Sequence, residues 1–120
     1  MEFDSEIQQI IKKYEDYVFV VEGKKDVAAM NNIGFERVHT IHNTGVPIRK
    51  RIEEIQSILR KKDKVCILTD FDKKGKQLYL LLKKEFSEAG VRLDGSFRGI
   101  LLKSGVSHIE GLDSYMNKIC

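Results

Sequence analysis

Two short runs of this 120-residue chain are apolar at nearly every successive position, and they constrain the fold more than any other feature. The runs are YVFVV at residues 17–21 and KVCILT at residues 64–69. A strand with one face in water alternates apolar and polar residues, whereas a continuous apolar strand is buried on both faces. We therefore expect a parallel sheet that is covered by helices on both sides.

Segments with helical spacing of apolar residues separate further strand-like runs. Helices are predicted at residues 25–33, 48–59 and 73–89. The runs RVHTI at 37–41 and FRGILL at 97–102 predict a second and a fourth strand. Strands that alternate with helices over short connections form right-handed βαβ units. The expected fold class is thus a Rossmann-like α/β fold with an open, mainly parallel four-stranded sheet and helices on both faces.

The N-terminal segment precedes this alternation and has a helical pattern of its own. Its apolar residues recur three and four positions apart: Phe3, Ile7, Ile10, Ile11 and Tyr14. This spacing predicts an amphipathic helix within residues 1–16. We expect the helix to pack on a single compact domain formed by residues 17–120.

Composition narrows the class of protein. Apolar residues make up 42% of the chain and charged residues 32%, which is typical of a globular protein. No apolar stretch approaches the roughly 20 residues that cross a bilayer, and the acidic start MEFDSE lacks the basic region of a signal peptide. Two cysteines give neither a disulfide framework nor zinc-ligand spacing. A cytoplasmic protein without a membrane partner is expected.

Carboxylates follow two of the predicted strands directly. Glu22 comes after the first strand, and Asp70 and Asp72 come after the third. Open α/β sheets bind ligands outside the carboxyl ends of their strands. If the chain stays extended, the two aspartates point to one side, about 7 Å apart at their Cα atoms. Such oxygen ligands suit Mg²⁺, which keeps waters and phosphate oxygens beside one or two carboxylates. They also suit Mn²⁺.

Lysines stand next to these carboxylates, at the start of two predicted helices: Lys24, Lys25, Lys73, Lys74 and Lys76. Cations at a helix start are unfavourable unless an anion is near, and a nucleic-acid phosphate or Asp72 would supply one. Two alternatives stay open from the residues alone. The lysines can be solvated, and Asp70 and Asp72 can serve as helix caps, because aspartate is a preferred N-cap.

Residues around Glu22 fit the same edge of the sheet. A carboxylate at the end of a buried strand suits proton transfer or metal binding. Gly23 is expected to permit a sharp turn into the next helix, and Asp26 to complement the N-terminus of that helix.

Three segments resemble, in order and spacing, the signatures of the Toprim domain: VFVVEGKKD at 18–26, HNTG at 42–45 and ILTDFDKKGKQL at 67–78. Topoisomerases, bacterial-type primases, OLD-family nucleases and the ribonuclease that matures 5S ribosomal RNA share this domain. The resemblance covers about Val18 to Leu102. A strand-ending Glu-Gly combined with a strand-ending Asp-x-Asp is far more specific than either part. The local sequences EGKKD and LTDFDKKGKQL are most similar to those of the ribonuclease and of small stand-alone Toprim proteins.

The resemblance implies a Toprim fold and a role for each matching residue. Glu22 corresponds to the carboxylate that acts as general acid or base in topoisomerases and helps to bind metal in primases and nucleases. Asp70 and Asp72 correspond to the Mg²⁺-binding pair. Gly45 corresponds to the glycine that ends the second strand and turn, with Asn43 beside it at the rim of the site.

A later segment is also similar to the ribonuclease. GVSHIEGL at residues 105–112 resembles a late acidic segment of that enzyme, which implies that Glu110 lies near the site.

Three functions follow from these observations. The first is Mg²⁺-dependent phosphodiester chemistry on RNA or DNA, nuclease-like, by the Toprim core alone, since no strand-passage domain, zinc ribbon or primase module is present in these residues. The alternative is a non-catalytic nucleic-acid-binding or regulatory module that needs a protein partner. No sequence feature fixes the oligomeric state.

The third function is a receiver-like phosphoacceptor domain, because Lys103 follows the last predicted strand. Receivers place an acidic pair after the first strand, however, where this chain has Glu-Gly-Lys.

Overall fold

The computed structural model describes residues 2–42 and 45–105, apart from the side chains of residues 2–7 and 104, and contains five helices and three strands within these ranges. The elements are α1 (Glu2–Tyr14), β1 (Val18–Val21), α2 (Lys24–Ile33), β2 (Val38–Thr40), α3 (Ile48–Ile58), β3 (Val65–Leu68), α4 (Lys73–Glu88) and α5 (Ser96–Ser104). In the described part of the chain, no helix combines the length and the apolar character that a membrane span requires.

The three strands form one parallel sheet in the order β2-β1-β3. Phe19 pairs with Val38 on one side of β1 and with Cys66 on the other. Because all strands run the same way, their carboxyl ends meet at a single edge of the sheet. The prediction of a parallel α/β sheet is confirmed.

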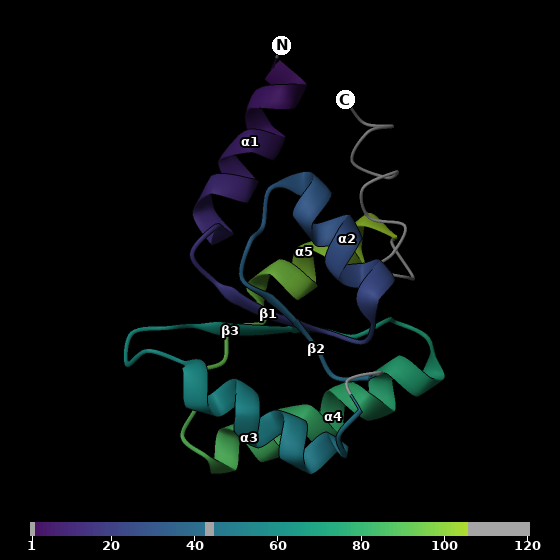
Figure 1. Cartoon of the computed structure of the whole chain (residues 1–120). Helices are drawn as coiled ribbons and strands as arrows, with labels where there is room; N and C mark the ends of the chain where they lie inside the picture. Colours follow the sequence, from purple (N-terminus) through teal and green to yellow (C-terminus); the bar gives the residue numbers. More distant parts are fainter. Residues whose placement is uncertain (1, 43–44, 106–120) are drawn as a thin grey trace.

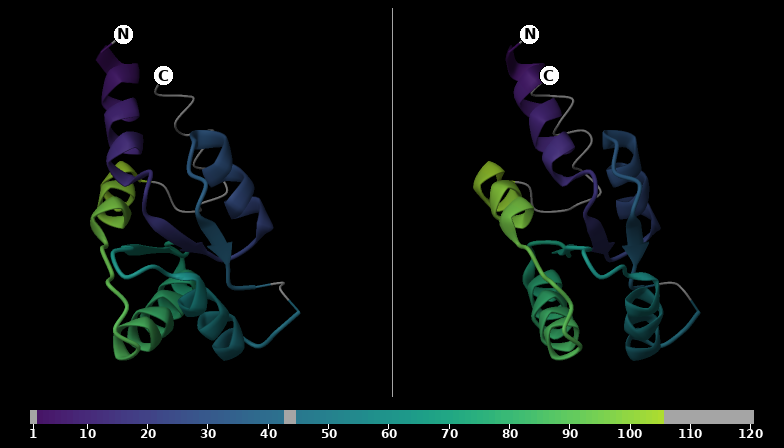
Figure 2. Two further views of the ribbon diagram at one scale, coloured as in Figure 1. Left: turned by 60° about the vertical axis from the view of Figure 1, so that its left-hand side comes forward. Right: turned by 90° about the vertical axis from the view of Figure 1, so that its left-hand side faces the viewer.

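Helices cover both faces of the sheet, with α1, α2 and α5 on one side and α3 and α4 on the other (Figures 1 and 2). Successive residues of β1 and β3 point to opposite faces and enter two separate cores. The first core is aromatic and includes Phe19, Val21, Phe35, Cys66, Leu68 and Phe97. The second includes Val18, Val20, Ile55, Val65, Ile67, Leu82 and Phe86. Burial on both faces explains why every residue of β1 (VFVV) and of β3 (VCIL) is apolar.

The predicted fourth strand at residues 97–102 is wrong, because this segment lies in helix α5. A strand would place Gly99, which has no side chain to pack, between Phe97 and Leu101. The helix instead buries Phe97 and Leu101, four residues apart, in the aromatic core. In the described chain, only an isolated bridge between Val65 and Leu93 extends the sheet beyond β3.

Because residues 97–102 form a helix, Lys103 does not follow a last strand, and that prediction is also wrong. Lys103 lies in the last turn of α5 and is exposed. The receiver-like hypothesis therefore loses the feature that suggested it.

Hydrogen bonds tie the N-terminal segment to the start of α5. The Tyr14 hydroxyl donates to Ser96 Oγ at 2.8 Å, and the Tyr17 hydroxyl donates to Asp94 Oδ2 at 2.7 Å. The Ser96 hydroxyl donates in turn to Asp94 Oδ1 at 2.6 Å. Tyr14 is buried in the aromatic core, so the C-terminal end of α1 is anchored to the sheet although the helix points away from it (Figure 2).

The Asp94 carboxylate is expected to make the fold acid-sensitive. Hydrogen bonds from the Ser96 and Tyr17 hydroxyls and from the Ser96 amide lower the pKa of Asp94 to about 2, whereas an aspartate in an unfolded chain has a pKa of about 3.9. Because the folded-state pKa is the lower one, this stabilisation is complete above about pH 4 and is lost as the pH falls to about 2. Thermal melts across this window should show a steeper fall in Tm for wild type than for Asp94→Asn. Parallel curves would assign the acid sensitivity to other carboxylates.

Candidate metal and nucleic-acid site

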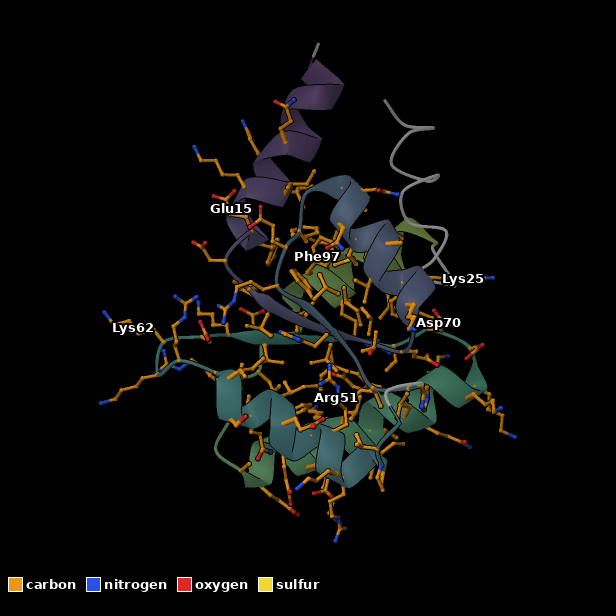
Figure 3. The ribbon with its side chains drawn as sticks, viewed as in Figure 1. Glu15, Lys25, Arg51, Lys62, Asp70 and Phe97 are labelled. Carbon is orange, nitrogen blue, oxygen red and sulfur yellow. The ribbon has the colours of Figure 1, made fainter. Side chains whose placement is uncertain are left out.

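A hydrogen bond joins the ends of β1 and β3. The main-chain N–H of Asp70 donates to Glu22 Oε2 at 2.8 Å, although the two residues are 48 positions apart in sequence. Both side chains are half-buried. Figure 3 shows Asp70 at the end of the sheet where these strands terminate. Glu22, Asp70 and Asp72, named here the acidic edge, therefore come from neighbouring strand ends, as the sequence predicts.

Asp72 is the N-cap of α4. Its Oδ1 accepts the main-chain N–H of Gly75 at 2.8 Å, and the residue is exposed. The helix-cap alternative is thus correct for Asp72, while Asp70 lies before the cap. A carboxylate has about four lone-pair sites, so capping leaves acceptor capacity on Asp72.

Gly75 lets the first turn of α4 pack directly on the main chain that follows β3. A Cβ added to Gly75 would lie 2.6 Å from the carbonyl carbon of Asp70 and closer still to its oxygen. The Thr69 hydroxyl donates to the Gly75 carbonyl at 2.7 Å on the same turn. Only glycine fits at this position, so Gly75 fixes how Asp70 approaches the helix.

Arg98 supports the same segment from α5. Arg98 is 7% exposed, and its Nη1 donates to the Thr69 carbonyl at 3.1 Å. Its guanidinium carbon lies 4.5 Å from the ring centroid of Phe71 and 4.0 Å from that of Tyr79. Burial lowers the pKa of Arg98 from its ordinary value. Residues 69–72 are therefore held by Glu22, by the first turn of α4 and by Arg98.

Sequence reasoning missed both of these supports. Arg98 lay within the segment predicted as a strand, so its side chain had no assigned neighbour. Gly75 carried a usable signal, since glycine is a poor helix former and stands inside the predicted helix at 73–89.

The turn after β1 differs from its prediction at Gly23. The Gly23 main chain is extended, with φ −144° and ψ −177°, and a Cβ there would meet nothing within 4 Å. The chain does bend at Glu22 and Gly23 between β1 and α2, as expected, but neither the conformation nor crowding at Gly23 requires glycine for this turn. Gly23 instead leaves the surface beside Glu22 open. Asp26 is buried, and its Oδ2 accepts the Gly23 N–H at 2.9 Å, which confirms that it caps α2.

The second signature segment reaches the acidic edge through its main chain. The His42 N–H donates to the Glu22 carbonyl at 2.9 Å. Gly45 has φ +81°, in the left-handed region that favours glycine. Asn43 and Glu110, which the Toprim resemblance implies at the site, lie outside the described residues.

The lysines that were predicted to bind phosphate flank the acidic edge. Lys24 and Lys25 begin α2, and Lys73 and Lys74 begin α4, with Lys76 one turn on. All five are exposed. Figure 3 shows Lys25 and Asp70 at the same end of the molecule. The ammonium groups of these five lysines form no ion pair within the described ranges, so they are accessible to an anion.

The donor set at the acidic edge fits a hard metal ion. Among residues 2–42 and 45–105, no three His, Cys, Asp or Glu side chains are grouped closely enough to hold a metal by themselves. Mg²⁺ does not require such a cage, because it binds through one or two carboxylates and keeps several waters. The oxygen donors of Glu22, Asp70 and Asp72 suit Mg²⁺ or Mn²⁺ rather than a thiolate-bound ion.

Fold and site together define a parallel α/β domain with carboxylates after adjacent strands and basic helix starts beside them. A family model of the Toprim domain matches residues 17–98. The chain therefore belongs to the Toprim family.

The chain is also similar to proteins of comparable length. UPF0292 protein MJ1624 of Methanocaldococcus jannaschii is 31% identical over 115 residues, which cover 93% of this chain and 88% of that protein. A UPF0292 protein of Thermococcus onnurineus is 30% identical over 108 residues, covering 88% and 77% of the two chains. A solved structure of a protein from Aquifex aeolicus has a TM-score of 0.73 and 30% identity, and the match covers 88% of this chain and 94% of that one. These names state no activity.

Proposed function

We propose that this Toprim protein carries out Mg²⁺-dependent phosphodiester chemistry on nucleic acid and acts as a nuclease. The observation that carries the proposal is the hydrogen bond from the Asp70 N–H to Glu22 Oε2, because it draws the acidic groups of two signature segments to one strand edge. Family membership supports nucleic acid as the substrate class.

Each group at the acidic edge has a chemical task in this proposal. Glu22, Asp70 and Asp72 would hold the ion directly or through its retained waters, and the bound ion would supply charge neutralisation at the phosphate. Glu22, half-buried beside Gly23, exchanges a proton with the attacking water or the leaving oxygen. The open surface at Gly23 gives the phosphate a close approach to that carboxylate.

Lysines at the starts of α2 and α4 hold the nucleic-acid backbone. Since each phosphate contact releases counterions, binding should weaken steeply as salt rises. Phosphate contacts do not read the bases, so they give affinity without sequence preference.

A second candidate is a non-catalytic nucleic-acid-binding or regulatory module. It is favoured by one observation, that the carboxylates in the described chain do not form a group of three able to hold a metal. In this case a protein partner would supply the chemistry.

A cleavage screen separates the two candidates. Structured RNA, duplex DNA and nicked DNA are incubated with Mg²⁺ or Mn²⁺, and we expect cleavage that EDTA abolishes and either ion restores. Asp70→Asn should lower the rate roughly 10- to 100-fold, since the amide oxygen is still a weak metal ligand and the main-chain bond to Glu22 is retained. Glu88→Gln, at an exposed position near the end of α4, is the matched control and should cleave normally.

The outcomes are distinct. Binding that depends on salt, with every substrate left intact, would support the regulatory module. Cleavage that survives both EDTA and Asp70→Asn would contradict a metal-dependent reaction at the acidic edge.

A further inference from the structure

The outer edge of β3 is only partly covered. The Val18 N–H donates to the Lys64 carbonyl. The main-chain N–H and carbonyl groups of Cys66 and Leu68 therefore also point toward β1, whereas those of Val65 and Ile67 point away from it. The outward groups of Val65 are satisfied: its N–H donates to the Arg92 carbonyl at 2.8 Å, and its carbonyl accepts the Asp94 N–H at 3.0 Å. The chain then turns away into α5.

Ile67 comes next along this edge and is 4% exposed. Within the described residues, neither its outward N–H nor its outward carbonyl has a hydrogen-bond partner. Buried main-chain donors and acceptors are nearly always paired, with protein, water or ligand. The Ile67 main chain therefore offers one donor and one acceptor to an incoming group.

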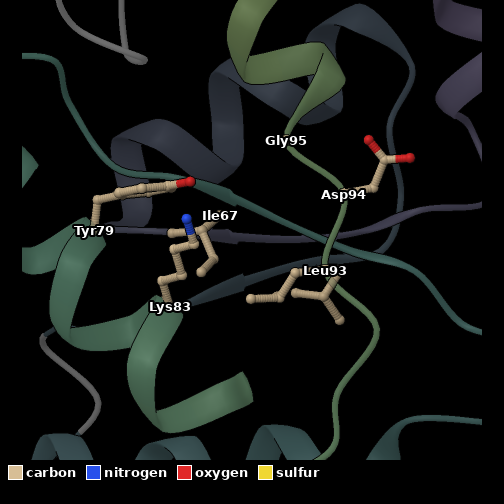
Figure 4. A pocket seen from close by; sticks show the side chains of 7 residues that line it. Ile67, Tyr79, Lys83, Leu93, Asp94 and Gly95 are labelled. Carbon is tan, nitrogen blue, oxygen red and sulfur yellow. The ribbon is translucent and has the colours of Figure 1, made fainter.

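A cavity of about 310 Å³ lies over this open edge. Val65, Ile67 and Leu93 give it apolar walls, and Tyr79 and Lys83 reach in from α4 (Figure 4). Its volume is at the lower end of the range of roughly 300–1,000 Å³ for small-molecule sites.

The accessible charge in this cavity is positive. Asp94 lines it, but the Asp94 carboxylate points away in Figure 4 and accepts hydrogen bonds from Tyr17 and Ser96. The Lys83 ammonium lies 5.9 Å from the Tyr79 ring centroid and forms no ion pair within the described ranges. An anionic group that enters would thus meet Lys83 and the Tyr79 hydroxyl.

These features select one ligand class. A peptide strand would need several open residues along the edge, whereas Val65 is already paired and the Thr69 carbonyl accepts Arg98. A nucleobase is flat and apolar on its faces and carries neighbouring donors and acceptors on its edge. We propose that this cavity binds a nucleotide, with the base edge on the Ile67 main chain and the phosphate toward Lys83.

The proposal concerns a place apart from the acidic edge and does not depend on catalysis there. The nucleotide can be free in solution or can be the terminal nucleotide of a nucleic acid. Both sources present the same base and phosphate.

An NMR titration tests the proposal directly. The ¹⁵N-labelled protein is titrated in EDTA with AMP, GMP, CMP and UMP, so that metal-dependent chemistry is absent. We expect saturable shifts for at least one nucleotide, with the Ile67 amide among the largest. The matching nucleoside should bind more weakly, because it lacks the phosphate that meets Lys83.

Three variants locate the ligand. Gly95→Leu should abolish binding, since the main chain of Gly95 has φ −95° and its added side chain would start 4.0 Å from the Tyr79 hydroxyl, at the wall of the cavity. Lys83→Ala should weaken nucleotide binding roughly tenfold and leave nucleoside binding unchanged. Lys84→Ala, the neighbouring exposed lysine outside the cavity, should match wild type.

The proposal is overturned if no nucleotide shifts the Ile67 amide, or if a folded Gly95→Leu protein binds as wild type does. A 5′-phosphorylated dinucleotide that gives the same shifts supports a terminal nucleotide as the source, and shifts with mononucleotides alone support a free one. Neither negative result bears on cleavage at the acidic edge.

Discussion

Glu22→Gln is expected to lower metal-dependent cleavage by roughly 10²–10⁴-fold, the range for loss of a general acid or base. Glutamine keeps the size of the side chain and an oxygen that can accept the Asp70 N–H, the contact that holds the two strand ends together. It removes the negative charge and the ability to exchange a proton. Single-turnover cleavage rates and thermal melts of the same preparations measure both consequences, and Tm should stay near that of wild type.

Glu22→Ala is the matched comparison. It removes the acceptor as well as the charge, so the Asp70 N–H loses a half-buried partner. An unsatisfied group of this kind costs about 1–3 kcal/mol, and a lower Tm should accompany the lost activity. Equal melting curves for the alanine and glutamine variants would mean that this hydrogen bond does not stabilise the loop. Full activity of Glu22→Gln would exclude the proposed proton transfer.

The architecture of the sheet could be predicted because two-sided burial leaves a direct trace in sequence. Val18 and Val20 enter one core while Phe19 and Val21 enter the other, so no position of β1 tolerates a polar side chain. The run at 97–102 misled because a short apolar segment fits either a strand or a helix. The segment is a helix because this conformation packs both Phe97 and Leu101 against the aromatic core.

The acidic edge could be predicted for a similar reason. Parallel strands place their carboxyl ends at one edge of the sheet, so the residues directly after β1 and β3 were expected at that edge, and the strand order β2-β1-β3 makes them neighbours there. The supports of that edge could not be predicted, because they depend on contacts between distant elements. Arg98 in α5 contacts Thr69, 29 residues away in sequence, and no local sequence pattern predicts that contact.

Gly75→Ala is expected to destabilise the protein by about 3 kcal/mol, the upper part of the range for overpacking a close contact. Alanine normally stabilises a helix relative to glycine, so the intrinsic effect has the opposite sign. The new methyl group, however, would collide with the main chain of Asp70, which cannot rotate away as a side chain would. Either α4 or residues 69–72 must shift, and the Asp70 N–H must then move relative to Glu22. Urea unfolding measures the free energy, and cleavage should fall with it.

Gly99→Ala provides the control within the same chain. Gly99 lies inside α5, and a Cβ there would meet nothing within 4 Å, so the substitution should stabilise the protein by about 0.5–1 kcal/mol. Opposite signs for the two glycine-to-alanine changes would show that Gly75 is required by the close approach of α4 to Asp70, and not by helix propensity. If Gly75→Ala were as stable as Gly99→Ala, the first turn of α4 and the acidic edge would not be in contact in solution, and Gly75 would have no part in positioning Asp70.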